Sequence, residues 1–269
     1  MLYWVEPRPP TSVPRVISGT PPELIVYDRP QRCPYLRGRV ARMPLRLPAR
    51  PLGRDELDQR LELGDRRQGF VLYRTMCPAC RACEPIRLDT STFSPNRAQR
   101  RAFSRGEGLL RVELGQPAVD ARRVALYNKH KSERGLSDGQ PPIDAEGYRD
   151  FLVSTCCDTL EIRYRLGEQL VGIAIADRST NALSAVYCYY DPDHKRLSLG
   201  TYSIMKQLEL CRLWGLRHLY LGLYIAECNA MAYKAAFLPH ERLLAGRWVQ
   251  ISGQPSAISG GPATSTSRK

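Results

Sequence analysis

The sequence contains no apolar run long enough to cross a membrane as a helix. Such a helix needs roughly 18 consecutive apolar residues, and no segment of the 269-residue chain approaches that length. The N-terminal stretch MLYWVEPRPPTSVPRV also lacks the basic start and apolar core of a secretory signal, since it carries several prolines and Glu6. These two absences predict a cytoplasmic protein without membrane attachment.

Histidine is scarce, with four residues in the whole chain. None of them lies in a motif typical of Ser-His-Asp or Cys-His catalysis. His194, in DPDHKR, is the one nearest to a conspicuous segment, and a solvated loop position is its simpler interpretation. The chain therefore gives no indication of nucleophilic catalysis assisted by histidine.

Acidic side chains are outnumbered by basic ones. The chain has 27 Asp and Glu against 40 Lys and Arg, which gives a formal net charge of +13. Such an excess favours a polyanionic partner, although a general bias toward arginine in the source proteome is an alternative. The clustering of the arginines favours a polyanionic partner over a general arginine bias. Seven arginines lie from Arg32 to Arg54, and four more lie from Arg97 to Arg105.

The nine cysteines are an odd number, and without an export signal we do not expect disulfides. YRTMCPACRACEPIR places Cys77, Cys80 and Cys83 three residues apart, and Cys33 precedes them in the same region. A zinc or iron–sulfur site needs about four ligands, so these four are candidate metal ligands. Three thiols near a turn are the alternative. The other five cysteines are interpreted as buried structural thiols.

Residues 1–115 are predicted to form a Cys/Arg-rich N-terminal region of short strands and loops. Its first 20 residues are proline-rich and expected to be loosely held, and residues 253–269 are expected to be a disordered tail. RLELGDRRQGFVLYR is predicted to be a hairpin. SPNRAQRRAFSRGEG is predicted to start a helix, with Ser94 as N-cap and Pro95 at the first helical position.

Residues 116–252 are predicted to form a second, C-terminal unit. A helix ends at Gly135, and another begins after Asp144 with Tyr148, Phe151 and Leu152 on its apolar face. LEIRYRL then alternates apolar and polar residues, as a strand does, and two further strands follow after short turns. The order from residue 159 is strand, strand, strand, helix, strand, helix. This order predicts an α/β (α+β) fold with a mixed or antiparallel sheet.

That order resembles the acyl-transfer half of the acetyltransferase (GNAT) fold. Five segments further resemble the signature blocks of the protein aminoacyltransferases, a family with eukaryotic arginyl and bacterial leucyl branches. They are CPYLRGRVARM (33–43), YRTMCPACRACEPIR (73–87), FSPNRAQRRA (93–102), AVYCYYDPDHKRLSLGTYSI (185–204) and YLGLYIAECNAMAYKAAFLP (220–239). The short chain and the CPYL sequence are more similar to the leucyl branch.

The resemblance implies transfer of an amino acid from a charged tRNA to the N-terminal amine of proteins that begin with Asp or Glu. The product is marked for degradation by the N-end rule, and no cofactor is required. The family's eukaryotic cysteines are implicated in metal or iron–sulfur binding. This chain lacks the second Cys of their first pair and the adjacent Cys-Cys of their second. DNA is not an expected partner, and the oligomeric state is open.

Candidate site residues follow from the resembling blocks. Asp191 could orient or deprotonate the amine, or serve as a turn residue before Pro192. Tyr187 and Tyr202 could stack on a base or donate to the ester, or pack in the core, and Lys234 could face the cleft or solvent. The candidate tRNA contacts are Arg39, Arg42, Arg97, Arg100, Arg101, Lys195 and Arg196.

Two other functions compete with aminoacyl transfer. An acetyl-CoA-dependent N-acetyltransferase of this fold needs a glycine-rich loop around the pyrophosphate, but RLSLGTY has Tyr202 where the second small residue would stand. A non-enzymatic RNA-binding module stabilised by cysteine-bound metal is the other. Within aminoacyl transfer, the sequence leaves arginine as an alternative donor to leucine.

Overall fold

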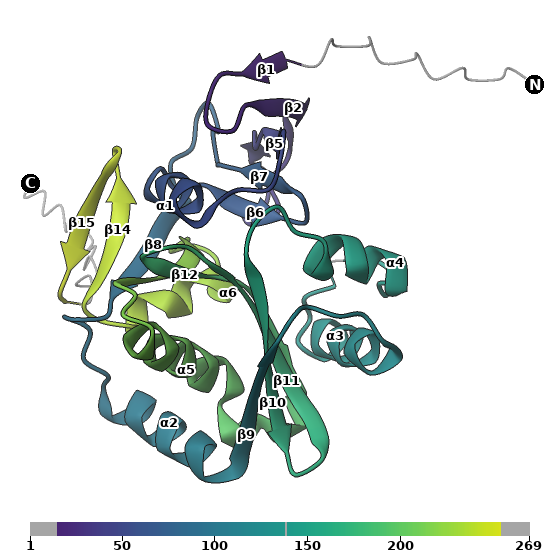
Figure 1. Cartoon of the computed structure of the whole chain (residues 1–269), viewed down its shortest axis with the longest axis vertical. Helices are drawn as coiled ribbons and strands as arrows, with labels where there is room; N and C mark the ends of the chain where they lie inside the picture. The colour runs from purple at the N-terminus through teal and green to yellow at the C-terminus, as the bar shows by residue number, and fades with distance from the viewer. Residues whose placement is uncertain (1–14, 138, 254–269) are drawn as a thin grey trace, which may run out of the picture.

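The computed structural model describes residues 15–137 and 139–253. Apart from residues 15–20 and 253, the predicted loose N-terminus and the predicted C-terminal tail lie outside these residues. No helix in the described ranges is long and apolar enough to span a membrane. The described chain forms a small and a large sheet with helices on both faces of the large one (Figure 1).

The small sheet has the order β1-β2-β5-β7-β6, and every neighbouring pair is antiparallel. Its strands are β1 (Arg15–Ile17), β2 (Glu23–Tyr27), β5 (Leu45–Pro48), β6 (Arg66–Gln68) and β7 (Val71–Tyr73). A separate two-stranded ribbon pairs β3 (Gln31–Arg32) with β4 (Val40–Ala41) around the CPYLRGR turn. The arginine-rich stretch from Arg32 to Arg54 therefore supplies strand β4 of this ribbon and strand β5 of the small sheet.

The hairpin predicted for RLELGDRRQGFVLYR is half confirmed. Strands β6 and β7 do pair, but RLEL belongs to the end of helix α1 (Arg54–Glu62) and the residue after it. The strand prediction was wrong there because Leu57 and Leu61 are four residues apart, which puts both on one helical face, where they are buried.

The large sheet has the order β15-β14-β8-β13-β12-β11-β10-β9. Its strands are β8 (Glu84–Asp89), β9 (Leu110–Gly115), β10 (Thr159–Leu166), β11 (Gln169–Arg178), β12 (Ala182–Tyr190), β13 (His218–Tyr224), β14 (His240–Leu244) and β15 (Arg247–Ile251). The sheet is mixed, since β12 and β13 are parallel and the other pairs are antiparallel. It combines strands from both sides of residue 115, and the predicted boundary there stays a prediction.

Helices cover both faces of this sheet (Figure 1). Helices α2 (Arg97–Leu109) and α5 (Leu199–Leu213) pack on one face around a core that includes Tyr164 and Leu208. Helices α3 (Ala121–Glu133) and α4 (Ala145–Tyr148) pack on the other, around Ile173 and Tyr189. The predicted α/β architecture and the element order from residue 159 are confirmed.

Helix ends follow local sequence, with one correction. Asn96 rather than Ser94 caps α2, because its side chain accepts from the Gln99 N–H at 2.9 Å while the Gln99 side chain accepts from the Asn96 N–H at 2.8 Å. This reciprocal pair is the capping box, and the same spacing is not available from residue 94. The predicted cap at Asp144 and the stop at Gly135, whose φ is 63°, are confirmed.

The two parallel strands separate soon after they meet. β12 and β13 pair only from Ala182–Ser184 to His218–Tyr220. Just beyond, each strand has a bulge against its other neighbour, at Val186 in β12 and Leu221 in β13. A bulge adds twist and bends a strand, so the strands diverge and leave backbone groups that no sheet partner satisfies. We call this opening between β12 and β13 the splay.

Candidate active site at the splay

Four of the five resembling sequence blocks meet at the splay. Short helices α6 (Asn229–Ala232) and η3 (Tyr233–Ala236) follow β13 and contact it, while β6 contacts β12 from the other side. Electrostatic contacts join side chains from each block. The residues linked in this way are Tyr35, Tyr73, Cys83, Tyr187, Cys188, Cys228, Tyr233 and Lys234.

Arg66, on β6, fills the inner part of the splay. Its Nη2 donates to the Ala185 carbonyl oxygen at 2.8 Å, and its Nη1 donates to Ser184 Oγ at 3.2 Å. On the opposite strand, a Cβ at Gly222 would stand 2.9 Å from Nη2 and 3.0 Å from Cζ. The guanidinium therefore lies between the two diverging strands, and Gly222, with φ at 88°, leaves the room for it.

Lys234 reaches the same opening from η3. Its side chain is buried, and Nζ donates to the Leu223 carbonyl oxygen of β13 at 2.7 Å. Burial, followed by the nearby Arg66 charge, lowers the pKa of Lys234 from 10.5 to about 7, against a smaller opposing effect of Cys228. A buried amine that is partly neutral near pH 7 can accept a proton, which an ordinary lysine cannot.

The four predicted metal ligands, Cys33, Cys77, Cys80 and Cys83, lie in one region of the structure. Burial raises the pKa of Cys83 to about 12, and the thiols of Cys33, Cys77, Cys80 and Cys228 act in the same direction. Within residues 15–137 and 139–253, no three potential ligands converge as a metal would require. No step of the chemistry below depends on a metal or cluster at these thiols.

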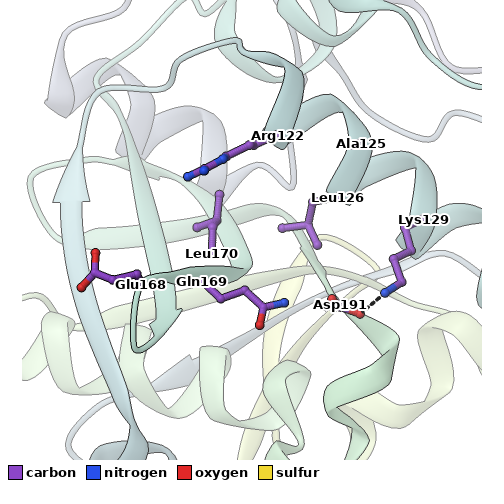
Figure 2. A pocket seen from close by; sticks show the side chains of 8 residues that line it. All are labelled: Arg122, Ala125, Leu126, Lys129, Glu168, Gln169, Leu170 and Asp191. Atoms are coloured by element: carbon purple, nitrogen blue, oxygen red, sulfur yellow. Dashed lines mark ion pairs between the residues drawn. The ribbon is translucent and has the colours of Figure 1, made fainter.

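A cavity of about 520 Å³ lies at the end of β12, against one face of α3 (Figure 2). Lys129 Nζ stands 2.7 Å from Asp191 Oδ1 and 2.6 Å from Asp193 Oδ2. Burial raises the pKa of Asp191, but Lys129 and the Asp193 N–H outweigh it, so the pKa is lowered overall. The Asp191 carboxylate therefore stays ionised and is a weak base. Arg122, on the other side of the cavity, forms no ion pair with any described carboxylate.

The structure does not bring the four predicted catalytic side chains together. Tyr187 belongs to an aromatic cluster on the α3 face, 5.7 Å from the Tyr127 ring. Tyr202 lies on the opposite face of the sheet, fully buried against α2, and its hydroxyl donates to Glu107 at 2.6 Å. Asp191 stands at the strand end and Lys234 in the splay. Tyr187 and Tyr202 therefore lie as the alternative of core packing has them, each against a hydrophobic cluster of its own face of the sheet.

Cationic and aromatic side chains border the splay on the side of α3. Arg134, which follows α3, contacts the Tyr190 hydroxyl and lies 5.4 Å from the centre of the Tyr190 ring. Burial raises the pKa of Tyr233 to about 12, and the charge of Arg134 opposes this shift, so the two are near each other. Tyr233 is nevertheless 52% exposed, which leaves part of its ring available to a ligand.

The predicted tRNA contacts divide into two groups. On one surface, the Arg105 guanidinium of α2 donates to the Arg196 carbonyl and joins the arginines of α2 to the turn η2 (Pro192–Leu197). We call this surface the α2–η2 patch, and its exposed cations are Arg97, Arg100, Arg101, Arg105, Lys195 and Arg196. None of the six forms an ion pair among the described residues. An unpaired cation cluster of this kind suits a polyanion.

Arg39 and Arg42 stand apart from the α2–η2 patch. Arg42 binds Asp28 through both Nε and Nη2, each at 2.7 Å, which largely neutralises it. Arg39 lies 3.5 Å from Glu227 and donates to the Cys80 sulfur at 3.8 Å. Both therefore already have partners in the fold.

Several residues of this site were not predicted from the sequence. Nothing in the sequence around Arg66 or Gly222 indicates a site, because the two residues come together only when β6 packs against β12 in the fold. Arg66 begins the short strand β6 (Arg66–Gln68), whose three residues are all polar, so the sequence gives no apolar pattern to mark it. Lys129 and Arg134 look like ordinary exposed residues of an amphipathic helix until the fold sets α3 beside Asp191 and Tyr190.

The described fold is a mixed α/β sheet that opens between two parallel strands, with the Arg66 guanidinium and the buried Lys234 amine in the opening. Models of the family "Arginine-tRNA-protein transferase" match this chain, the N-terminal model at residues 31–101 and the C-terminal model at residues 122–244. The chain belongs to this family of aminoacyl-tRNA–protein transferases.

Relatives named aspartate/glutamate leucyltransferase are similar over most of their length. The protein from Chromobacterium violaceum is 39% identical over 81% of this chain and 90% of its own. Those from Thiobacillus denitrificans and Hahella chejuensis are 37% and 33% identical, over 80% and 85% of this chain and 90% and 97% of theirs. A solved structure, L-PGS from Bacillus licheniformis, matches at a TM-score of 0.40 and 11% identity over 54% of this chain and 48% of that one, too weak for any inference.

Proposed function

We propose that this protein transfers leucine from leucyl-tRNA to the N-terminal amine of proteins that begin with aspartate or glutamate. The observation that carries the proposal is the 39% identity to a protein named aspartate/glutamate leucyltransferase, over 90% of that protein. The products would carry an N-terminal leucine and enter N-end-rule degradation. We expect the enzyme to act in the cytoplasm, with RNA and protein but not DNA as partners.

The reaction makes modest chemical demands. The acceptor nitrogen forms a bond to the ester carbonyl carbon, the bond from that carbon to the terminal ribose oxygen breaks, and the ribose leaves as a free hydroxyl. The attacking α-amine has an ordinary pKa near 8. Placing it against an already activated ester can contribute on the order of 7 kcal/mol. The enzyme must then remove one proton from the nitrogen and stabilise the developing oxyanion.

Lys234 is the proposed proton acceptor, and Asp191 the proposed positioning group. A base works best when its pKa lies near the working pH, and the pKa of Lys234 is about 7. The pKa of Asp191 is lowered by its contacts, so its carboxylate would hold a cation better than it would take a proton. Its position beside Lys129, at the end of β12, suits a role in aligning Lys129 or an incoming ammonium.

The surface charge supports a tRNA donor. The α2–η2 patch offers six exposed cations for backbone phosphates. Tyr190, Tyr233 and the Arg134 guanidinium border the splay, where aromatic faces and a cation could stack with the terminal adenine. We further propose that residues 116–252 are GNAT-like, since β12, α5 and β13 follow the order of that fold and the splay lies where it places its acyl donor. We also propose that the cysteines have a structural role and that the transfer requires no cofactor.

Side-by-side donor assays test the proposal. Purified protein is mixed with a peptide that begins with Asp and with labelled leucyl-tRNA, arginyl-tRNA or acetyl-CoA, and peptide-bound label is counted. We expect label from leucyl-tRNA. Arginyl-tRNA is the second candidate, because the family models carry the arginine name. Label from acetyl-CoA alone, or tRNA binding without transfer from either charged tRNA, would overturn the proposal.

A further inference from the structure

The Arg66 guanidinium has no counter-charge among the residues that the structure describes. Arg66 is 9% exposed and forms no ion pair with any carboxylate of residues 15–137 or 139–253. Its Nε is buried without a hydrogen-bond partner. Taking a cation out of water costs several kcal/mol unless an opposite charge compensates it. Its neighbour Arg67, equally buried, has that compensation: it donates to Asp177 at 2.8 Å.

A second cationic side chain lies close to Arg66. Lys234 is 7% exposed, also without an ion pair among the described residues, and the two are near enough for Arg66 to act on it. Two buried basic groups side by side destabilise a protein, because each disfavours the charge of the other. Ionisable groups perturbed in this way gather at functional sites, and an anion bound between the two would compensate both.

We propose that Arg66 binds the side-chain carboxylate of the acceptor's N-terminal Asp or Glu. This inference rests on the function proposed above. A guanidinium has five N–H donors, and two of them already hold Ser184 and Ala185, so Nε and other N–H groups remain for an anion. In an acidic N-terminal residue the carboxylate is only a few bonds from the α-amine. Holding it at Arg66 therefore brings that amine beside Lys234.

A buried cation suits a small carboxylate better than an RNA phosphate. Phosphates of a folded RNA approach a surface, and the exposed arginines of the α2–η2 patch serve that purpose. Arg66 instead lies inside the splay between Ser184, Ala185 and Gly222, and at 9% exposed it is not a surface cation of the kind that RNA phosphates contact.

Arg66→Gln tests the inference with two acceptor peptides that differ only in beginning with Asp or Asn. The wild-type enzyme, with leucyl-tRNA, should prefer Asp. In Arg66→Gln we expect kcat/KM for the Asp peptide to fall about 30- to 100-fold, the usual effect of removing a charged partner of a carboxylate. The fall for the Asn peptide should be much smaller, so the Asp/Asn ratio collapses. KM for leucyl-tRNA should stay near the wild-type value.

Two further variants separate recognition from folding. Arg67→Gln removes an equally buried but paired arginine; it should lower the melting temperature and leave the Asp/Asn ratio intact. Gly222→Ala keeps Arg66 but places a methyl 2.9 Å from Nη2, so it should lower the ratio by displacing the guanidinium. Because φ is 88° there, its folding is checked by circular dichroism.

Each outcome decides the inference. Equal losses with both peptides in Arg66→Gln, or a larger KM for leucyl-tRNA with an unchanged Asp/Asn ratio, would overturn it, the second by assigning Arg66 to RNA. Failure of the proposed function is a different result, since the wild type would then transfer no leucine to either peptide. If Arg66→Gln does not fold, an Asp/Asn ratio unchanged in Gly222→Ala overturns the inference and a collapsed one supports it.

Discussion

Replacing Lys234 with methionine should make the enzyme more stable and far less active. Methionine has a similar length and no charge, so it fills the same space between Leu223 and Met231. In the unfolded chain lysine holds its proton up to about pH 10.5, whereas in the folded protein the pKa is about 7. Between these two values the unfolded state binds the extra proton, so wild-type stability rises with pH.

The magnitude follows from the two pKa values. At pH 7, where folded Lys234 is about half protonated, the lowered pKa costs the folded protein about 4 kcal/mol, and at pH 9 the cost is about 2 kcal/mol. The variant loses the hydrogen bond to the Leu223 carbonyl, worth about 1 kcal/mol. Lys234→Met should therefore exceed the wild type by about 3 kcal/mol at pH 7 and by about 1 kcal/mol at pH 9.

Urea unfolding at both pH values measures the stability difference, and single-turnover leucyl transfer measures the activity. Loss of a general base should lower the transfer rate about 100-fold or more. Lys234→Arg, which keeps a charge but cannot release it, serves as the control and should be inactive and less stable. A methionine variant less stable than the wild type, or one that transfers leucine at the wild-type rate, would refute the assignment.

Three other predictions give independent checks. Arg100→Glu with Arg101→Glu should weaken tRNA binding at least tenfold and lower the slope of log affinity against log salt by roughly 1 per arginine, which filter binding at several salt concentrations would measure; an unchanged slope contradicts the patch. Asp191→Asn should lower kcat about tenfold or more without shifting the lower midpoint of the pH–rate profile, which belongs to Lys234; a shifted midpoint would make Asp191 the base. Gly106→Ala puts a methyl 2.1 Å from the Tyr202 ring and should cost about 1–3 kcal/mol by urea unfolding, whereas Gly108→Ala meets nothing within 4 Å and should be neutral or stabilising.

The sequence predicts local structure well where one segment carries its own signal. Alternation in residues 159–166 and the turn at Gly167 predict β10 and the start of β11, and both are present. The cap of α2 was misplaced by two residues, because Ser94 and Asn96 are both good caps and only the contact with Gln99 distinguishes them. The sequence does not predict the helical end of α1 from Arg60 to Glu62, because so short a segment fits both the two-residue period of a strand and the 3.6-residue period of a helix.

The candidate site was predictable only in part, since it is made by contacts between distant segments. For Lys234 the sequence leaves a cleft and a solvated face as alternatives, and the structure buries the side chain. Arg66 was not predicted, because its importance depends on β6 crossing β12, 118 residues away at Ser184, and on a counter-charge that is missing. Tyr187 and Tyr202 lie in the same block as Asp191, but strand alternation and helix direction send their rings to opposite faces of the sheet.

Tandem mass spectrometry of the product tests the central claim most directly. The protein is incubated with leucyl-tRNA and a peptide that begins with Asp and also contains an internal lysine. We predict a product longer by one leucine, joined by a peptide bond to the α-amine of the Asp. A peptide recovered unchanged, or leucine found on the lysine side chain, would contradict the account.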